Sequence, residues 1–410
     1  MRTKEELLKE VKNLNWFTGE WESKAWQMSI EGLVDYTKKK IIYGWLDGHI
    51  HLDRCFTYDE KFLPVGINLQ EIADLPLQVK QDLVGFLHDG LAYTEESLIE
   101  RMVRQIKRAI KVGTRVIWAV IDTTPDIGLR AFNIAQELRE NFKNQIEMKI
   151  GCYPVFGLKN PLENRDRLDI LEQAAKKADF IVGLPEKDEE EDRIGFKGHV
   201  STLLEIAYKE KKEVHFHVDQ ANSAFQEDSF RVIECLESLL PEKLNWFKSA
   251  TDRPKIWLVH VISPSCYNPE KFSRLVELLI NYNIGVIICP TAAISMCELR
   301  SEKAPIHNSI ARVIEMLKAG VRVAFGTDNV NDIFVPSSSG LILREVSEIS
   351  NYIRNYTLHI LVKVAMGIPL NKGDRAILGK ALYEKGKACK RHSELLAKNT
   401  QKEKNIKFDF

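Results

Sequence analysis

The chain has 410 residues, with 58 basic and 58 acidic side chains and a sequence pI of about 7.1. This charge balance gives no electrostatic reason to expect binding to nucleic acid or to a membrane surface. The 7 cysteines include no CxxC pair, which suits free thiols in a reducing compartment. No apolar run approaches the roughly 20 residues of a membrane span, and the first residues lack a signal-peptide core. We therefore expect a soluble, cytoplasmic globular protein.

Short apolar runs alternate along the chain with amphipathic helical patterns. Residues 1–38 predict an N-terminal helical extension, and residues 371–410 predict a polar helical tail. Helical patterns at 97–113 and 308–320 each end on a glycine, which is a common helix stop. Between the two ends of the chain, β-branched and aromatic runs predict eight strands, at 39–47, 115–122, 147–154, 179–185, 213–219, 255–262, 284–290 and 322–328.

Eight strands in alternation with helices predict a parallel sheet with right-handed crossovers. Eight is also the number that closes into a (β/α)₈, or TIM, barrel, which we expect over residues 39–370. A doubly wound open sheet is the rival fold, but its glycine-rich phosphate turn is absent. Residues 52–94 form a long connection after the first strand, long enough to act as a lid.

The histidines and one aspartate gather at the predicted strand ends. His49 and His51 follow the first strand, His215 and His217 end the fifth, His260 ends the sixth and Asp328 ends the eighth. In a barrel these ends meet at one mouth, where barrel enzymes place their chemistry. Three imidazoles and a carboxylate suit one divalent ion such as Zn²⁺ or Fe²⁺. The alternative is that each residue is an ordinary core or loop polar group. Spacing alone does not choose between His215 and His217, which point to the same side of their strand.

Four segments resemble the metal motifs of the amidohydrolase superfamily, and specifically its cytosine deaminase-like branch. They are "DGHIHLD" (47–53), "HFHVDQ" (215–220), "LVHVIS" (258–263) and "VRVAFGTDNV" (321–330), in the family's order. The resemblance implies that His49, His51, His217 and Asp328 bind one catalytic metal. It further implies that Asp328 is the general base and that His260 contacts the activated water or the substrate.

The sequence departs from this resemblance at three points. Family deaminases have a proton-shuttling glutamate where this chain has Gln220, and an amide cannot carry a proton at neutral pH. A glutamine that holds the base is replaced by Val155. The β-sandwich formed by both chain ends is reduced or absent, since residues 370–410 contain nothing like its last strand. Lys187 lies soon after the fourth strand, where a carboxylated lysine bridges two metals in binuclear relatives, but a plain surface lysine is the simpler interpretation.

Further residues are assigned to the mouth by their positions. Asp53, His215, Asn329 and His307 are candidate substrate-binding residues, although capping or packing explains each of them too. Gln220 is expected to orient the substrate, and a proton for the leaving group would come from Asp328, Glu186 or Glu227.

Two functions compete. The first is a metal-dependent hydrolase of a C–N bond, an aminohydrolase (deaminase) that attacks a nitrogen heterocycle with a metal-activated water. The second is a non-catalytic or repurposed barrel that acts as a subunit of an assembly, as Gln220 suggests. Relatives commonly assemble, so we expect a homo-oligomer that binds neither nucleic acid nor membrane.

Overall fold

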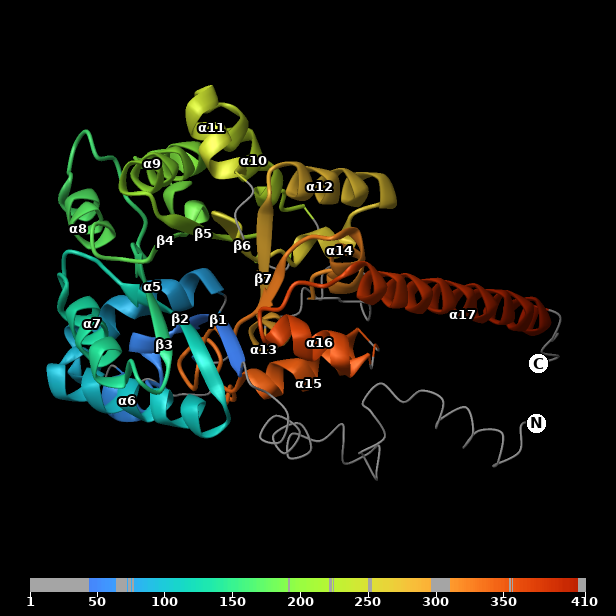
Figure 1. Ribbon diagram of the computed structural model, residues 1–410, viewed down its shortest axis with the longest axis horizontal. Helices are drawn as coiled ribbons and strands as arrows, with labels where there is room; N and C mark the ends of the chain where they lie inside the picture. Colours follow the sequence, from blue (N-terminus) through green and yellow to red (C-terminus); the bar gives the residue numbers. More distant parts are fainter. Residues whose placement is uncertain are drawn as a thin grey trace, which may run out of the picture.

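Eight parallel strands form the centre of the fold (Figure 1). The computed structural model describes residues 44–63, 72, 75, 77–190, 192–220, 223, 225–249, 253–295, 310–353, 355 and 357–404. Each strand pairs in parallel with the next one in the chain, from β1 to β8. The strands are β1 Trp45–His51, β2 Thr114–Asp122, β3 Glu147–Tyr153, β4 Phe180–Gly183, β5 Glu213–Val218, β6 Ile256–His260, β7 Ile284–Ile288 and β8 Val323–Phe325.

The last strand returns to the first and brings the sheet to near closure. A parallel bridge joins Ile50 to Asp328, and the backbone N–H of His51 donates to the carbonyl oxygen of Asp328 at 3.0 Å. The next bond along this seam runs from Asp328 N–H to His49 O at 2.7 Å. The predicted (β/α)₈ barrel is therefore confirmed.

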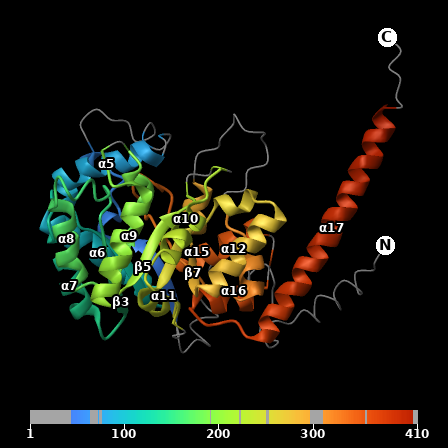
Figure 2. The ribbon, with the colours of Figure 1, turned by 90° about the horizontal axis from the view of Figure 1, so that it is seen from above.

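Helices follow the strands and surround them, as the two views in Figures 1 and 2 show. Short 3₁₀ turns come directly after β1, β4 and β6, at Leu52–Arg54, Pro185–Asp188 and Ser263–Cys266. Two more, Glu60–Phe62 and Leu91–Tyr93, lie in the long connection before β2. The helices are α5 Leu77–Asp89, α6 Glu95–Lys111, α7 Arg130–Phe142, α8 Asp166–Ala175, α9 Gly195–Glu210, α10 Asp228–Glu237, α11 Pro241–Lys248, α12 Pro269–Asn281, α13 Pro290–Ile294, α14 Val313–Ala319, α15 Ile342–Tyr352, α16 Leu358–Ala365 and α17 Lys372–Lys404.

Helix α6 illustrates how the sequence pattern makes the outer layer. Its apolar residues recur at helical spacing, so that Leu98, Met102 and Ile106 are all buried against the barrel. The Thr94 side chain caps its N-terminus by accepting from the backbone N–H of Ser97. Gly113 just beyond the helix has φ of +91°, a left-handed conformation that allows the chain to turn into β2.

The first strand ends later than the sequence predicted. The prediction was 39–47, of which residues 39–43 lie outside the described part of the chain, whereas β1 covers Trp45–His51. His49 and His51 therefore lie within the strand rather than after it. The apolar pattern hides this extension, because the strand's second half carries Asp47 and two histidines. All seven of its residues are nevertheless buried.

Helix α17 extends away from the barrel in both views (Figures 1 and 2). Its first turns are held to the barrel by Leu378, which is fully buried, and by Asp374, which pairs with Lys363 of α16 at 2.8 Å. The predicted helical extension at 1–38 lies outside the described residues. Within the described part of the chain, all eight strands belong to the barrel, and no helix has the length and apolarity to cross a membrane.

Candidate metal centre and pocket

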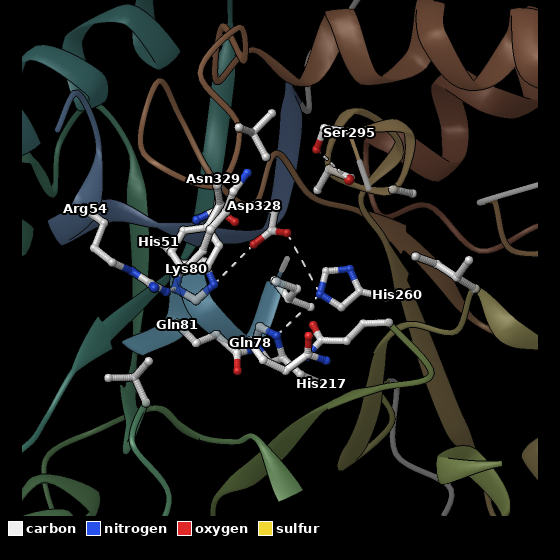
Figure 3. Close-up of a pocket in the computed structure, with 18 of the residues that line it drawn as sticks. His51, Arg54, Gln78, Lys80, Gln81, His217, His260, Ser295, Asp328 and Asn329 are labelled. Carbon is white, nitrogen blue, oxygen red and sulfur yellow. Dashed lines mark hydrogen bonds and ion pairs between the residues drawn. The ribbon is translucent and has the colours of Figure 1, made fainter. Parts of the chain in front are cut away.

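Four of the predicted ligands meet at the C-terminal mouth of the barrel. His49 and His51 come from β1 and His217 from β5, and one ring nitrogen from each lies within 4.8 Å of the other two. Asp328 follows β8, with its Oδ1 3.6 Å from His49 Nε2 and 3.2 Å from His51 Nε2. Figure 3 shows His51, His217 and Asp328 around a common centre. Zinc ligands at tetrahedral positions lie about 3.4 Å apart, so small rotations would bring these atoms to one ion.

His260 completes the ring of polar groups from the end of β6. Its Nε2 lies 3.4 Å from His217 Nδ1 and 3.9 Å from Asp328 Oδ2 (Figure 3). Cys289 is also close to His260 and Asp328. Burial raises the pKa of the Cys289 thiol well above its usual value, which favours the protonated thiol over a metal-binding thiolate.

The electrostatics of the cluster favour neutral imidazoles. Burial lowers the pKa of His49, His51 and His217 well below the usual value, and neighbouring positive groups lower it further. Both ring nitrogens of His49, Nε2 of His217 and Oδ1 of Asp328 are buried without a hydrogen-bond partner among the described residues. Buried polar atoms are rarely left unpaired. A neutral imidazole has one lone pair, and a cation bound to that lone pair of His49 and of His217 and to Asp328 Oδ1 would give these acceptors a partner.

His51 has an additional neighbour that affects this fit. The guanidinium of Arg54 contacts His51 Nδ1 through Nη2, and its Nε lies 3.6 Å from Asp122 Oδ2. Because an arginine only donates, Nδ1 is the acceptor and the neutral ring carries its proton on Nε2. Coordination through His51 Nε2 therefore requires that this proton leave or that Arg54 shift. The other three ligands fit a cation as they stand.

The seam between β1 and β8 sets the positions of these ligands. The carboxylate of Asp47 accepts from Thr327 N at 3.0 Å and from Thr327 Oγ1 at 2.7 Å. Gly326 allows the close approach, since a Cβ there would lie 2.7 Å from the Cβ of His49. Asp328 itself has φ of +57°, an uncommon conformation for a residue with a side chain, and so its carboxylate is directed by the backbone as well as by packing.

A pocket of about 150 Å³ opens above the cluster. A cavity of about 150 Å³ is known to hold benzene, so this space suits one six-membered ring. Tyr153 supplies an aromatic wall: its ring stacks on His217 with centroids 5.3 Å apart and planes 6° apart. Helix α5, within the long connection after β1, contributes Lys80 and Gln81 to the lining (Figure 3).

The remaining predicted site residues fall into three groups. Gln220 and Asn329 line the pocket, together with His51, His217, His260 and Asp328. The Gln220 amide donates to Glu186 at 2.6 Å, and the Asn329 amide donates to Asp332 at 2.6 Å. His307 lies outside the described residues.

Asp53 and His215 have places other than the substrate pocket predicted for them. The Asp53 carboxylate accepts from Tyr93 Oη at 3.0 Å and from Asp122 N at 2.9 Å, which makes it part of the scaffold behind Arg54. His215 lies deeper in the barrel, stacked on Phe180 with centroids 4.2 Å apart. Both residues are fully buried, and neither lines the pocket.

Three charged residues that the sequence singled out lie outside the pocket lining. Glu227 is exposed and pairs with Lys271, whereas Glu186 is half-buried beside Gln220. Lys187 is buried rather than on the surface, with its Nζ 2.5 Å from Asp82 Oδ1. It does not line the pocket, and we find no support for a second metal there.

Several pocket residues were not singled out from the sequence. Arg54, Tyr153, Lys80 and Gln81 line the pocket. The length of the connection after β1 was the one available signal for Lys80 and Gln81. Nothing in the spacing distinguished Arg54 and Tyr153 from ordinary residues near strand ends.

Comparison with known proteins identifies the family of the chain. A model of the amidohydrolase family matches residues 41–370, and the chain therefore belongs to that family. An uncharacterized protein of Haemophilus influenzae is 26% identical over 292 residues, which cover 70% of this chain and 96% of that protein. The resemblance inferred from the four motifs is confirmed at the level of the family.

Two solved structures show the same fold. The 5-methylcytosine deaminase of Klebsiella pneumoniae, liganded with 5-fluorocytosine, has a TM-score of 0.65 at 19% identity and covers 82% of this chain and 74% of its own. The N-isopropylammelide isopropylaminohydrolase of Burkholderia multivorans has a TM-score of 0.59 at 18% identity, with 79% and 74% covered. Identities this low show a shared fold, not a shared substrate.

Proposed function

We propose that the protein is a metal-dependent hydrolase of a C–N bond, and specifically an aminohydrolase that acts on a nitrogen heterocycle. The observation that carries the proposal is the set of unpartnered, buried ligand atoms on His49, His217 and Asp328 at the floor of a ring-sized pocket. Membership in the amidohydrolase family and the deaminase-like fold of its structural neighbours support the same reaction class.

The donor set suits Zn²⁺ or Fe²⁺ held by His49, His51, His217 and Asp328. A divalent ion in this position supplies the Lewis acidity that makes water a nucleophile at neutral pH. Side chains of the protein carry out the proton transfer and the stabilisation of charge. Asp328 accepts a proton from the attacking water, and His260, 3.9 Å away, stabilises the charge that develops on the substrate. A C–O bond forms, the C–N bond breaks, and the amine leaves with the proton that Asp328 returns.

Proton delivery to the leaving amine is assigned to Asp328 because of where the other acids lie. Glu227 is tied to Lys271 on the exposed surface. Glu186 is half-buried and does not line the pocket, and its carboxylate accepts from the Gln220 amide. Since an amide does not relay protons at neutral pH, this contact with Gln220 gives Glu186 no proton path to the reaction.

A substrate panel tests the proposed activity. Zinc-loaded and iron-loaded protein is incubated with cytosine-like bases, aminotriazines and hydantoin-type rings, and ammonia, amine and ring-opened products are measured. We expect turnover of at least one compound and its loss by more than about 10³-fold in His49→Ala. Glu189→Gln is the control, because Glu189 is exposed and pairs with Arg231 away from the pocket.

One observation favours the second candidate, a repurposed barrel without catalysis. Gln220 occupies the place where family deaminases have their proton shuttle, as the resemblance implies. If the protein binds metal, turns over nothing in the panel and retains its biological activity in His49→Ala, the non-catalytic function is correct. If Gln220→Glu then gains deaminase activity, the shuttle alone was missing.

A further inference from the structure

Two glutamines on opposite elements of the pocket share one carboxylate. Gln220 follows β5 and donates from Nε2 to Glu186 Oε1 at 2.6 Å. Gln81, on helix α5, donates from Nε2 to the same oxygen at 3.3 Å. Both glutamines line the pocket and each is 5% exposed, whereas Glu186 stands behind them and does not line it.

This arrangement fixes the orientation of both amides. An ionised carboxylate only accepts hydrogen bonds, so each amide must turn its NH₂ group toward Glu186. Its carbonyl oxygen is then directed away from Glu186. Burial raises the pKa of Glu186 above its usual value, and the two amide donors offset part of this rise by stabilising the ionised form.

A second observation points to a ligand. The carbonyl oxygen of Gln81, Oε1, is buried and has no hydrogen-bond partner in the described part of the chain. An unpaired buried acceptor is unfavourable, and an N–H group from a bound molecule would satisfy it.

We propose that Glu186 holds Gln81 and Gln220 as a pair of carbonyl acceptors, and that the pocket therefore selects heterocycles that carry ring N–H groups, namely amino-substituted cyclic amides and ureides. The inference rests on the proposed function for its ring-sized substrate, and it narrows the class of that substrate. Glu186 is a positioning residue here, since it acts through the two amides.

The test is a binding measurement, which does not depend on turnover. Zinc-loaded protein is titrated calorimetrically with uracil and with two isomers, 5,6-dimethyluracil and 1,3-dimethyluracil. The isomers have the same atoms, but only the second lacks both ring N–H groups. We expect uracil and 5,6-dimethyluracil to bind at least about ten-fold more tightly than 1,3-dimethyluracil.

Three variants test which residues cause the preference for ring N–H groups. In Glu186→Gln the amides are free to turn, so the preference should fall to within about three-fold, while metal content is unchanged. Gln81→Met keeps the volume but removes one acceptor, and uracil affinity should fall by about ten-fold. Glu189→Gln, on the same loop and exposed, should behave as the wild type.

Several outcomes would overturn the inference. They are equal binding of the two isomers, binding of none of the three compounds, and a preference that persists in Glu186→Gln. Loss of turnover in Glu186→Gln with the binding preference intact would instead make Glu186 a proton donor. Failure of the proposed hydrolysis is distinct, because it would appear as absent turnover with the binding preference retained.

Discussion

The backbone N–H of Asp328 donates to the carbonyl oxygen of His49 at 2.7 Å, and this bond closes the barrel. The same two residues supply candidate ligands whose Oδ1 and Nε2 atoms lie 3.6 Å apart. The hydrogen bonds that close the barrel between β1 and β8 therefore also position two of the candidate metal ligands. Changes at the seam should affect metal affinity even where the altered residue is not a ligand.

Asp47 provides the first test of this coupling. Its carboxylate binds both the N–H and the hydroxyl of Thr327, next to Asp328. Asp47→Ala should lower metal affinity by about ten-fold or more, since residues that orient ligands typically have effects of that size. It should also reduce the free energy of unfolding by about 1–3 kcal/mol, because the N–H of Thr327 loses its partner. Chelator competition and urea unfolding measure the two effects.

Asp169→Ala is the matched control for that variant. Asp169, on the outer helix α8, is half exposed and pairs with Arg165 just before that helix, so its loss should change stability by less than about 1 kcal/mol. Metal affinity in Asp47→Ala equal to that of the control would show that the seam does not position Asp328.

Tyr153 tests whether ring packing holds His217 in place. The parallel stack between the two rings leaves Tyr153 3% exposed. Tyr153→Ala should reduce the free energy of unfolding by about 3–5 kcal/mol and weaken metal binding by about ten-fold, because the imidazole gains freedom to rotate. Tyr153→Phe preserves the stack, and its metal affinity should remain within about two-fold of the wild type. Equal metal affinity in all three proteins would contradict this account.

Helix α5 is held over the pocket by a buried charged group. His88 contacts Asp122 at 3.1 Å, at the end of β2, and Asp126 at 2.6 Å. Burial would lower the pKa of His88, but its hydrogen bonds to these two aspartates raise it to about 9. The folded-state pKa thus exceeds the unfolded value of 6.5, and protonated His88 stabilises the fold below about pH 6.5.

This stabilisation should be lost as the pH rises through 9. The difference in unfolding free energy between wild type and His88→Gln should shrink by roughly 3 kcal/mol between about pH 6 and pH 10, at about 1.4 kcal/mol per pKa unit. Urea unfolding across this range measures it. A difference that stays constant with pH would show that His88 does not carry a proton in the folded protein.

The sequence predicted most of the barrel because strands buried on both faces are apolar throughout. The bounds of strands β2 to β8 agree with the predicted ranges to within about three residues. The exception is β1, where Asp47, His49 and His51 replace the apolar residues that mark a buried strand. The polar residues that belong to the candidate site are therefore the same residues that hid the end of this strand in the sequence pattern.

The sequence predicted the site as far as strand ends define the mouth of a barrel. It did not predict how deep in the barrel each side chain of a strand lies. His215 and His217 point to the same side of β5, yet one lies among Phe180, Trp118 and Trp257 and the other beside His49. Gln81 was missed for a related reason: on an amphipathic helix, a glutamine is expected to face solvent unless the helix is known to cover a pocket.

Metal content measured by elemental mass spectrometry tests the central claim most directly. Three proteins are compared after loading with Zn²⁺ and removal of excess ion: wild type, His217→Ala and His215→Phe. His215→Phe is the control, since His215 belongs to the aromatic layer below the site. We predict about one ion per chain in the wild type and in His215→Phe, and less than about a tenth of that in His217→Ala. Full occupancy in His217→Ala, or none in the wild type, would contradict the account.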